Sequence, residues 1–271
     1  VRYSFQHGFV GLQPLSNVRL MNAREKLQYE FDAGFTNAIA DSMIRNRITA
    51  GVYPAGSTLF TLSQTQRDQL WSLMESRGAG DWGQYYLQDA STDQHEVSLS
   101  GSSEKIRYFL SLNKFNEVGL LYKSRRDRTG GRFNIEYQAY DWLKTGVNLG
   151  VTHANEYQNR ELNNVQSPWR AYFTTNPYEP LYMPDGSYNL TLQGFSALEG
   201  QDKNTFFIDR IGTFATLFAE AKPIAGLAFK TQLAMNYNIL KTESYLQPGS
   251  NLAAILGYSQ KEDGGNTDFQ Y

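Results

Sequence analysis

The chain has 271 residues, a formal net charge of −2 and a pI of about 6.0, so no basic footprint argues for a nucleic-acid partner. It contains no cysteine, which excludes disulfides and thiolate metal sites, and its three histidines (His7, His95 and His153) have no ligand-like spacing. Its mean hydropathy is −0.51, and no apolar run approaches the roughly 18 residues of a spanning helix. That value does not argue against a transmembrane barrel, because half of each barrel strand faces a polar lumen.

The first segment predicts a strand followed by a long excursion. In "VRYSFQHGFVG", Val1, Tyr3 and Phe5 alternate with polar residues, which is the period of a strand. Residues 11–92 follow as a long loop with two predicted helices. The stretch "NAREKLQYEFDAGFTNAIADSMIRNR" starts at Asn22 with Glu25 at capping-box spacing, and "TQRDQLWSLMESRG" has Thr65 as its expected N-cap.

The segment that starts at Lys105 shows the clearest strand pattern in the chain. One face carries Ile106, Tyr108, Leu110 and Leu112, while the other carries Lys105, Arg107, Phe109, Ser111 and Asn113. Period-two alternation of this kind predicts a strand whose two faces meet unlike surroundings. The surroundings are either lipid and a wet lumen or, in a soluble sandwich, a core and solvent.

Further strands follow with the same rhythm. "QHEVSLSG", "RFNIEYQAY" and "KTGVNLGVTHA" alternate, and "TFFIDRIGTFATLFAEA" and "LAFKTQLAMNYNIL" form an expected hairpin across "KPIAG". In the first strand of that hairpin, the best register puts Thr213, Ala215, Leu217 and Ala219 outward and leaves Phe214 and Phe218 inward. The polar, Gly-rich end of the chain is expected to be a loop.

The connections between these strands alternate in length. Residues 11–92 and 155–204 are long and 116–128 are intermediate, whereas "GSSE", "YDWL" and "KPIAG" are short turns. Short turns on one side and long loops on the other are how bacterial outer-membrane barrels are built, and aromatic residues fall near the strand ends. We therefore predict an all-β fold: a partial antiparallel transmembrane β-barrel of about seven up-and-down strands, with helix-containing long extracellular loops.

Several stretches together resemble the SusC/RagA family of TonB-linked outer-membrane transporters. They are Asp81-Trp82, "VSLSG", "EKIRYFLSL", Gly119 in "EVGLL", "RFNIEY", "LMNAREKLQYE" and the later "NPYEPLYMPDGSYN". The resemblance implies a part of a 22-stranded plugged barrel in the outer membrane of a Gram-negative bacterium. It also implies that residues 1–271 are a barrel fragment, without the plug, the TonB-contact segment or the remaining strands.

The resemblance further implies the function and its partners. These are TonB-dependent import of a large nutrient, an oligosaccharide or a peptide, handed over by a SusD-like surface lipoprotein, with TonB acting through the missing plug segment. Outer-membrane lipid is the other expected partner, and neither a nucleic acid, a cofactor, a metal nor an enzymatic activity is expected. No G-x-S-x-G, zinc signature or P-loop occurs in the sequence.

The aromatic loop "SPWRAYFTTNPYEPLYMPDGSY" holds the candidate substrate-binding residues. Exposed aromatic rings with a few polar groups are typical of sugar and peptide sites. The alternative is that these rings pack the loop onto the rim or onto the partner protein, and Trp82 is expected to anchor a loop in that way. The candidates are Trp169, Arg170, Tyr172, Tyr178 and Tyr182.

A second set of polar residues is expected to face the lumen. They line the transit path or meet the plug, unless they only hydrate the lumen or pair across strands. Two rival functions stay open: a soluble carbohydrate-binding β-protein and a barrel-type hydrolase, which the three separated histidines support poorly. The lumen-facing candidates are Arg107, Arg132, Glu136, Asn148 and Lys230.

Overall fold

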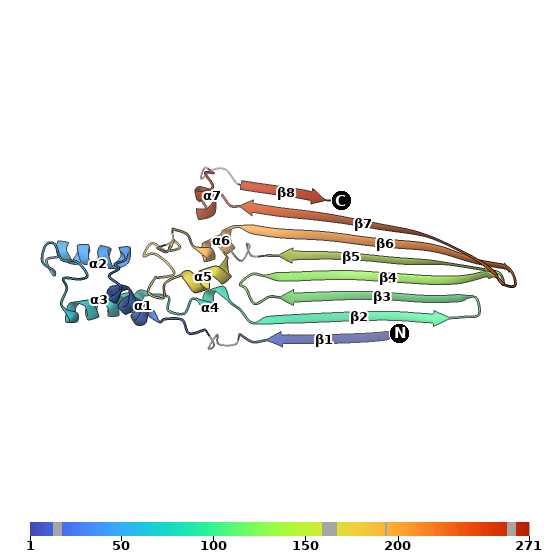
Figure 1. The fold of residues 1–271 in the computed structure, drawn as a ribbon, viewed down its shortest axis with the longest axis horizontal. Coiled ribbons are helices and arrows are strands. Elements are labelled where there is room, and N and C mark those ends of the chain that lie inside the picture. The colour runs from blue at the N-terminus through green and yellow to red at the C-terminus, as the bar shows by residue number, and fades with distance from the viewer. Residues whose placement is uncertain (13–17, 159–166, 193, 259–263, 271) are drawn as a thin grey trace.

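One antiparallel sheet of eight strands dominates the chain, in the order β1 to β8 (Figure 1). A computed structural model describes residues 1–12, 18–158, 167–192, 194–258 and 264–270. Each strand pairs with its neighbours in sequence, so the sheet is a pure up-and-down meander. The strands are β1 (Arg2–Val10), β2 (Ala90–Ser102), β3 (Ile106–Val118), β4 (Arg125–Tyr140), β5 (Leu143–Tyr157), β6 (Thr205–Ile224), β7 (Leu227–Leu246) and β8 (Gly264–Gln270).

The connections are one-sided, as the sequence predicts. The β2–β3, β4–β5 and β6–β7 turns lie at one end of the sheet, here called the turn end, and all helices of the described residues gather at the other, the helix end (Figure 1). Two expectations are wrong. The intermediate loop 116–128 is shorter than expected, because β3 runs to Val118 and β4 begins at Arg125, and the C-terminal tail contains the strand β8.

The 11–92 excursion holds four helices rather than two. The predicted first helix is divided into α1 (Ala23–Asp32) and α2 (Ala38–Thr49), because Gly34 adopts φ 79° and ends the helical path. The Asn22–Glu25 capping box is confirmed. In α3 (Gln64–Arg77) the N-cap is Ser63, not Thr65, because Ser63 forms a capping box with Gln66. The others are α4 (Gly83–Tyr86), α5 (Pro168–Thr174), α6 (Ala197–Lys203) and α7 (Asn251–Ile255).

No helix in the described part of the chain has the length and apolar character needed to cross a membrane. The buried core instead lies among the helices at the helix end. One cluster joins α1, α2 and α3 through Leu27, Ile44, Leu70 and Met74. A second cluster, centred on Trp82 and Tyr86, joins α4, α5 and α6. The helices therefore pack as a cap over one end of the sheet and not along its faces (Figure 1).

The pairing register divides the sheet into two unlike faces. Leu233 pairs with Leu217, Leu217 with Val147 and Val147 with Ile135, so apolar side chains stand side by side across four strands. We call this the apolar face. Its large apolar and aromatic members include Val97, Leu99, Ile106, Tyr108, Leu110, Leu112, Phe133, Ile135, Tyr137, Val147, Leu149, Val151, Leu217, Leu233, Met235 and Tyr237.

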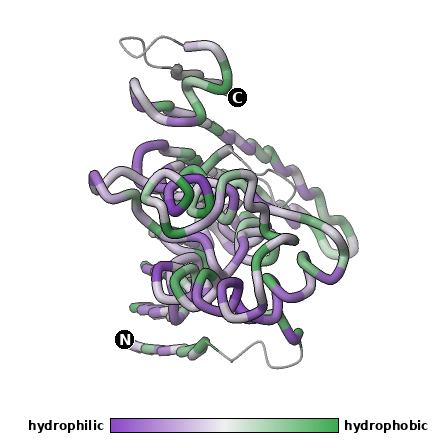
Figure 2. The backbone as a smooth tube through the Cα atoms, turned by 90° about the vertical axis from the view of Figure 1, so that its left-hand side faces the viewer, coloured by the Kyte–Doolittle hydropathy of each residue, from purple (hydrophilic) through white to green (hydrophobic). Residues whose placement is uncertain are grey.

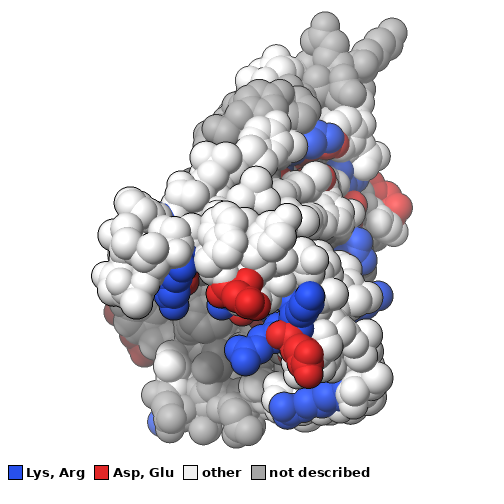
Figure 3. Space-filling view, turned by 90° about the vertical axis from the view of Figure 1, so that its right-hand side faces the viewer, with Lys and Arg blue, Asp and Glu red and all other residues white. Residues whose placement is uncertain are grey.

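The apolar face is uncovered in the structure. Leu233 is 69% exposed and Leu112 is 58% exposed, which is the reverse of a sandwich core. Hydrophilic and hydrophobic residues alternate along the strands (Figure 2), and acidic and basic side chains are intermixed when the molecule is seen from the turn end (Figure 3). A continuous band of this kind across the six strands β2 to β7 requires an apolar environment.

The opposite side, here called the polar face, confirms the expected β6 register. Phe214 pairs with Gly150 and Phe218 with Gly146, on the side away from Leu217. The two rings lie directly over these glycines, because a Cβ added to Gly150 would be 2.0 Å from Phe214 and one added to Gly146 would be 2.3 Å from Phe218. The glycines therefore make room for the rings on an otherwise hydrophilic face.

Candidate functional site

The aromatic loop presents part of the predicted site to solvent. Trp169 and Arg170 lie exposed on α5, and the Trp169 ring contacts Phe173 edge-on at 5.2 Å between centroids. Tyr182 is 48% exposed and its ring packs against Tyr188 across a short β-bridge. The loop thus presents two aromatic pairs, Trp169–Phe173 and Tyr182–Tyr188, which with Arg170 are here called the aromatic surface. Phe173 was missed by sequence reasoning, although its four-residue spacing from Trp169 places both on one helix face.

Tyr178 lies in the interior and not on that surface. It is 1% exposed, within the core of the α1–α3 cluster, and its hydroxyl donates to both carboxylate oxygens of Glu30 at 3.0 Å. Burial and the Glu30 carboxylate raise the pKa of the Tyr178 hydroxyl above its usual range. In this arrangement Tyr178 fastens the loop to α1, which is the packing alternative stated for these aromatics.

Glu179 is the buried acid beside it. Its carboxylate accepts hydrogen bonds from the Asn176 side chain at 2.8 Å and from the Leu192 N–H at 2.7 Å, and the residue is 1% exposed. Burial raises the pKa of Glu179, and the hydrogen bonds from Asn176 and Leu192 oppose that rise. Glu179 thus closes the loop between residues 176 and 192 upon itself.

Trp82 and Tyr172 hold the loop from the other side. Trp82 is buried and its indole N–H donates to the Asn176 carbonyl at 3.0 Å, so its expected role as a loop anchor is confirmed. Tyr172 is half-buried, with its ring close to Gly83, and burial together with Asp81 raises the pKa of its hydroxyl. Tyr172 is therefore only partly available to a ligand.

A carboxylate on α6 ties this loop to the strands. Asp202 accepts hydrogen bonds from Lys123, Tyr122 and Tyr188, which come from the β3–β4 turn and the aromatic loop. Burial alone would raise the pKa of Asp202, but the hydrogen bonds from Lys123 and Tyr188 hold it below its usual range. Lys123 adopts φ 62°, which a non-glycine residue sustains only when its surroundings fix it.

All five residues predicted to face the lumen lie on the polar face. Arg107 pairs with Glu136, Asn148 pairs with Asn134, and Lys230 pairs with Glu220. Arg132 pairs with Ser111 and Gly150 on the same side. The alternation of the strands alone brings these residues together, since one register shared by β3 to β7 sends every second side chain to this face.

The charges on the polar face alternate in sign near the turn end. The Glu136 carboxylate lies 2.9 Å from Lys144 Nζ, and the Glu220 carboxylate lies 2.9 Å from Lys222 Nζ. The Glu136–Lys144 pair joins β4 and β5 and favours their register, whereas Glu220 and Lys222 both lie on β6; exposed pairs of this kind contribute modestly to stability. Among the described residues no group of three or more His, Cys, Asp or Glu side chains is placed to hold a metal ion.

An uncovered apolar band on one side, a charged and hydrophilic surface on the other, and one-sided connections define the wall of an outer-membrane β-barrel. In sequence, 120 residues of the chain are 31% identical to a TonB-dependent receptor of Formosa agariphila, over 44% of this chain and 11% of that protein. No family model matches the chain.

The fold is similar to that of a solved transporter. A chain of the RagAB peptide transporter superposes on 92% of this chain with a TM-score of 0.62 at 21% identity, and the match covers 29% of that chain. The RagAB peptide importer in its open-open state superposes with a TM-score of 0.61 at 18% identity, over 92% of this chain and 28% of that one. These likenesses establish the fold.

The chain thus spans about a tenth of its receptor relative and under a third of the transporter chain. The receptor relative thus supports in sequence the predicted resemblance to TonB-linked transporters, and the likeness to the RagAB chains confirms the predicted partial-barrel fold.

Proposed function

We propose that this chain forms part of the wall and the extracellular loops of an importer that moves a large nutrient across the outer membrane, driven through TonB. The observation that carries the proposal is the pair of unlike faces: an uncovered apolar band backed by a charged polar face. The relative that is a TonB-dependent receptor and the fold neighbour that is a peptide transporter support the same activity. No covalent chemistry is part of this proposal.

The polar face supplies the lumen side of that wall. Arg107, Arg132, Glu136, Asn148 and Lys230 then face either the transit path or a plug that fills the lumen. Opposite charges that neutralise each other, across strands for Glu136 and Lys144 and along β6 for Glu220 and Lys222, leave a hydrated surface without a strong field of one sign. Such a surface suits the passage of an uncharged or mixed-charge solute.

The exposed aromatic surface supplies the first contact with the nutrient, an oligosaccharide or a peptide. Trp169, Phe173 and Tyr182 offer exposed rings, and Arg170 is the exposed residue next to Trp169 on α5, while Tyr172 and Tyr178 position the loop that carries them. In this proposal the same surface is where a SusD-like lipoprotein docks.

Uptake by intact cells tests the proposal. Cells that carry or lack the gene are given fluorescent mixtures of oligosaccharides or of peptides, with and without a protonophore that removes the energy supply of TonB. We expect gene-dependent accumulation of one of the two mixtures, lost with the protonophore and reduced by Trp169→Ala with Phe173→Ala. Accumulation of neither mixture, or a protein that fractionates with the soluble material, contradicts the proposal.

A further inference from the structure

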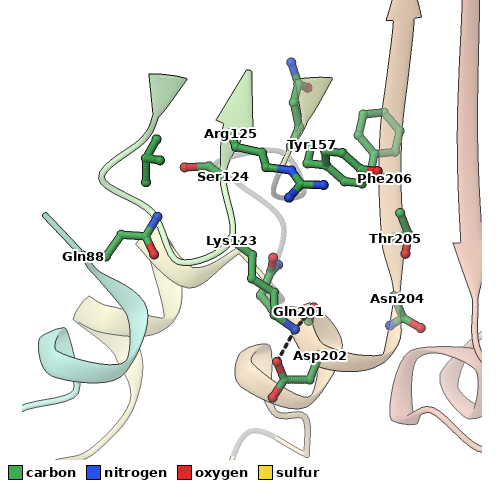
Figure 4. A pocket seen from close by; sticks show the side chains of 12 residues that line it. Gln88, Lys123, Ser124, Arg125, Tyr157, Gln201, Asp202, Asn204, Thr205 and Phe206 are labelled. Atoms are coloured by element: carbon green, nitrogen blue, oxygen red, sulfur yellow. Dashed lines mark hydrogen bonds and ion pairs between the residues drawn. The ribbon is translucent and has the colours of Figure 1, made fainter. Parts of the chain in front are cut away.

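A cavity of about 440 Å³ lies at the helix end of the sheet, outside the surfaces described above. It is bounded by the β3–β4 turn, the end of β5, the start of β6 and α6 (Figure 4). Its lining combines the Arg125 guanidinium, aromatic rings and several side-chain amides. The lining residues used below are Gln88, Lys123, Arg125, Tyr157, Asn204 and Phe206.

The cavity belongs mainly to the membrane side of the wall. Val118 pairs with Arg125, Arg125 with Tyr157 and Tyr157 with Phe207, and this row has the same parity as the apolar face. Thr205, which also lines the cavity, precedes Phe207 by two residues and shares that side. Phe206, of opposite parity, borders the cavity at the start of β6. A solute that passes along the polar face therefore moves on the side of the wall opposite this cavity.

The cavity carries a positive charge that nothing in the described residues balances. The Arg125 guanidinium stacks 4.1 Å from the centroid of the Tyr157 ring, and within the described residues it has no carboxylate at ion-pair distance. Lys123, by contrast, is neutralised by Asp202. The nearest acid on the same side of β4 is Asp127, two residues along the strand. A guanidinium held on an aromatic ring presents its N–H edge to an anionic oxygen.

A buried amide donor points to the same chemistry. Asn204 lines the cavity, and its Oδ1 accepts the Gln247 N–H at 3.1 Å. Its Nδ2 is buried and has no acceptor among the described residues. A buried donor without an acceptor is costly, so a ligand that brings acceptor oxygens gains free energy at this position.

The height of the cavity above the apolar band selects the kind of ligand. The band ends on β3 to β5 at the row of Lys114, Thr129 and His153, and Arg125 lies four residues beyond Thr129 on β4. That is about 13 Å along the strand, or about 10 Å of height at a strand tilt of about 40°. The headgroup layer of a phospholipid bilayer is only about 5–8 Å thick on each side. Arg125 therefore lies above the phosphates of an ordinary phospholipid.

We propose that this cavity binds the anionic saccharide headgroup of an outer-leaflet glycolipid. Arg125 contacts a phosphate or carboxylate of the headgroup, and Asn204 Nδ2 donates to a neighbouring oxygen. The rings of Tyr157 and Phe206 and the amide of Gln88 contact the sugars. This inference depends on the position of the wall in the membrane and not on the imported nutrient, so it stands or fails separately from the uptake experiment.

Lipid retention tests the site. The protein is extracted from outer membranes, placed in phosphatidylcholine nanodiscs that also contain either rough lipopolysaccharide or phosphatidylglycerol, and the retained lipid is counted by native mass spectrometry. We expect preferential retention of lipopolysaccharide. Arg125→Gln lowers that retention about fivefold, the factor expected for one basic side chain at an anionic surface. Arg125→Lys keeps part of it.

Arg126→Gln is the matched control, because Arg126 is the next residue but faces the polar side, opposite Glu117 and Glu156. We expect it to leave retention unchanged. Asn204→Asp keeps the acceptor for Gln247 but replaces the donor by an anion, so it lowers retention as well. Equal retention of both lipids, equal loss in Arg126→Gln, or displacement of the lipid by millimolar inorganic phosphate overturns the proposal.

Discussion

Placing a charge on the apolar face tests the orientation of the wall with a calculable penalty. Leu233 is 69% exposed. The apolar side chains of β7 extend from Leu227 to Ile239, and Leu233 lies in the middle of this run. That run is about 40 Å along the strand, or about 30 Å of height after tilt, which matches the hydrocarbon thickness of a bilayer. Leu233 therefore lies near the bilayer midplane, where an arginine costs about 2–4 kcal/mol.

We expect Leu233→Arg to lower the free energy of unfolding by that amount, a factor of about 30 to 700 in the equilibrium constant. The assay is urea titration of the full protein folded into phosphatidylcholine vesicles, followed by tryptophan fluorescence. The matched control is Gln232→Arg, one residue earlier and on the polar face opposite Phe218, with an expected change within about 0.5 kcal/mol. Equal effects of the two substitutions would refute the two-faced wall.

Three further changes test the interior of the structure. Gly150→Ala places a Cβ 2.0 Å from the Phe214 ring and is expected to cost about 1–3 kcal/mol by the same titration, with Phe214→Leu restoring part of the loss; no restoration would contradict the contact. Tyr178→Phe removes one donor from Glu30, which keeps Asn37 and Lys26 as partners, so we expect a loss of about 1 kcal/mol and faster hydrogen exchange in residues 176–192. Unchanged exchange would rule out the fastening role. The pKa of the Glu179 carboxyl is raised above 4.5 in the folded state, so its contribution to stability is greatest below pH 4.5 and is lost as the pH rises through the raised value. The protection of residues 176–192 against hydrogen exchange should therefore fall over that range. Glu179→Gln should make this protection less dependent on pH.

Period-two patterning predicts the strands and their faces wherever lipid and water lie on opposite sides. The register of β6 is a demanding case, and the inward positions of Phe214 and Phe218 are found in the structure over Gly150 and Gly146. The difference in polarity between the two faces of a strand disappears beyond the apolar band, where both faces meet water. The start of β4 carries charged residues on both faces, so its strand was predicted as a loop.

The composition of the aromatic loop predicts where a ligand surface lies but not which rings are exposed. Tyr178 is buried because its partner Glu30 lies 148 positions earlier in the chain, and no local pattern records that contact. The glycine at position 34, where the first predicted helix is divided, is a local signal in the sequence, and it adopts φ 79° in the structure. The apolar spacing that continues on both sides of Gly34 concealed this signal. The Asp202 contacts and the Arg125 cavity depend on turns brought together only by the folded sheet.

Single-cysteine scanning along β7 reads directly which side chains face lipid, and residues 1–271 contain no cysteine that would interfere. Each position from Ala228 to Ile239 is replaced in turn, labelled with an environment-sensitive fluorophore in vesicles, and quenched either by brominated lipid or by aqueous iodide. A lipid face alternating with a lumen face predicts quenching by lipid at Phe229, Leu233 and Tyr237 and by iodide at Lys230, Gln232 and Asn236. Quenching by iodide at every position, or by lipid at every position, would contradict it.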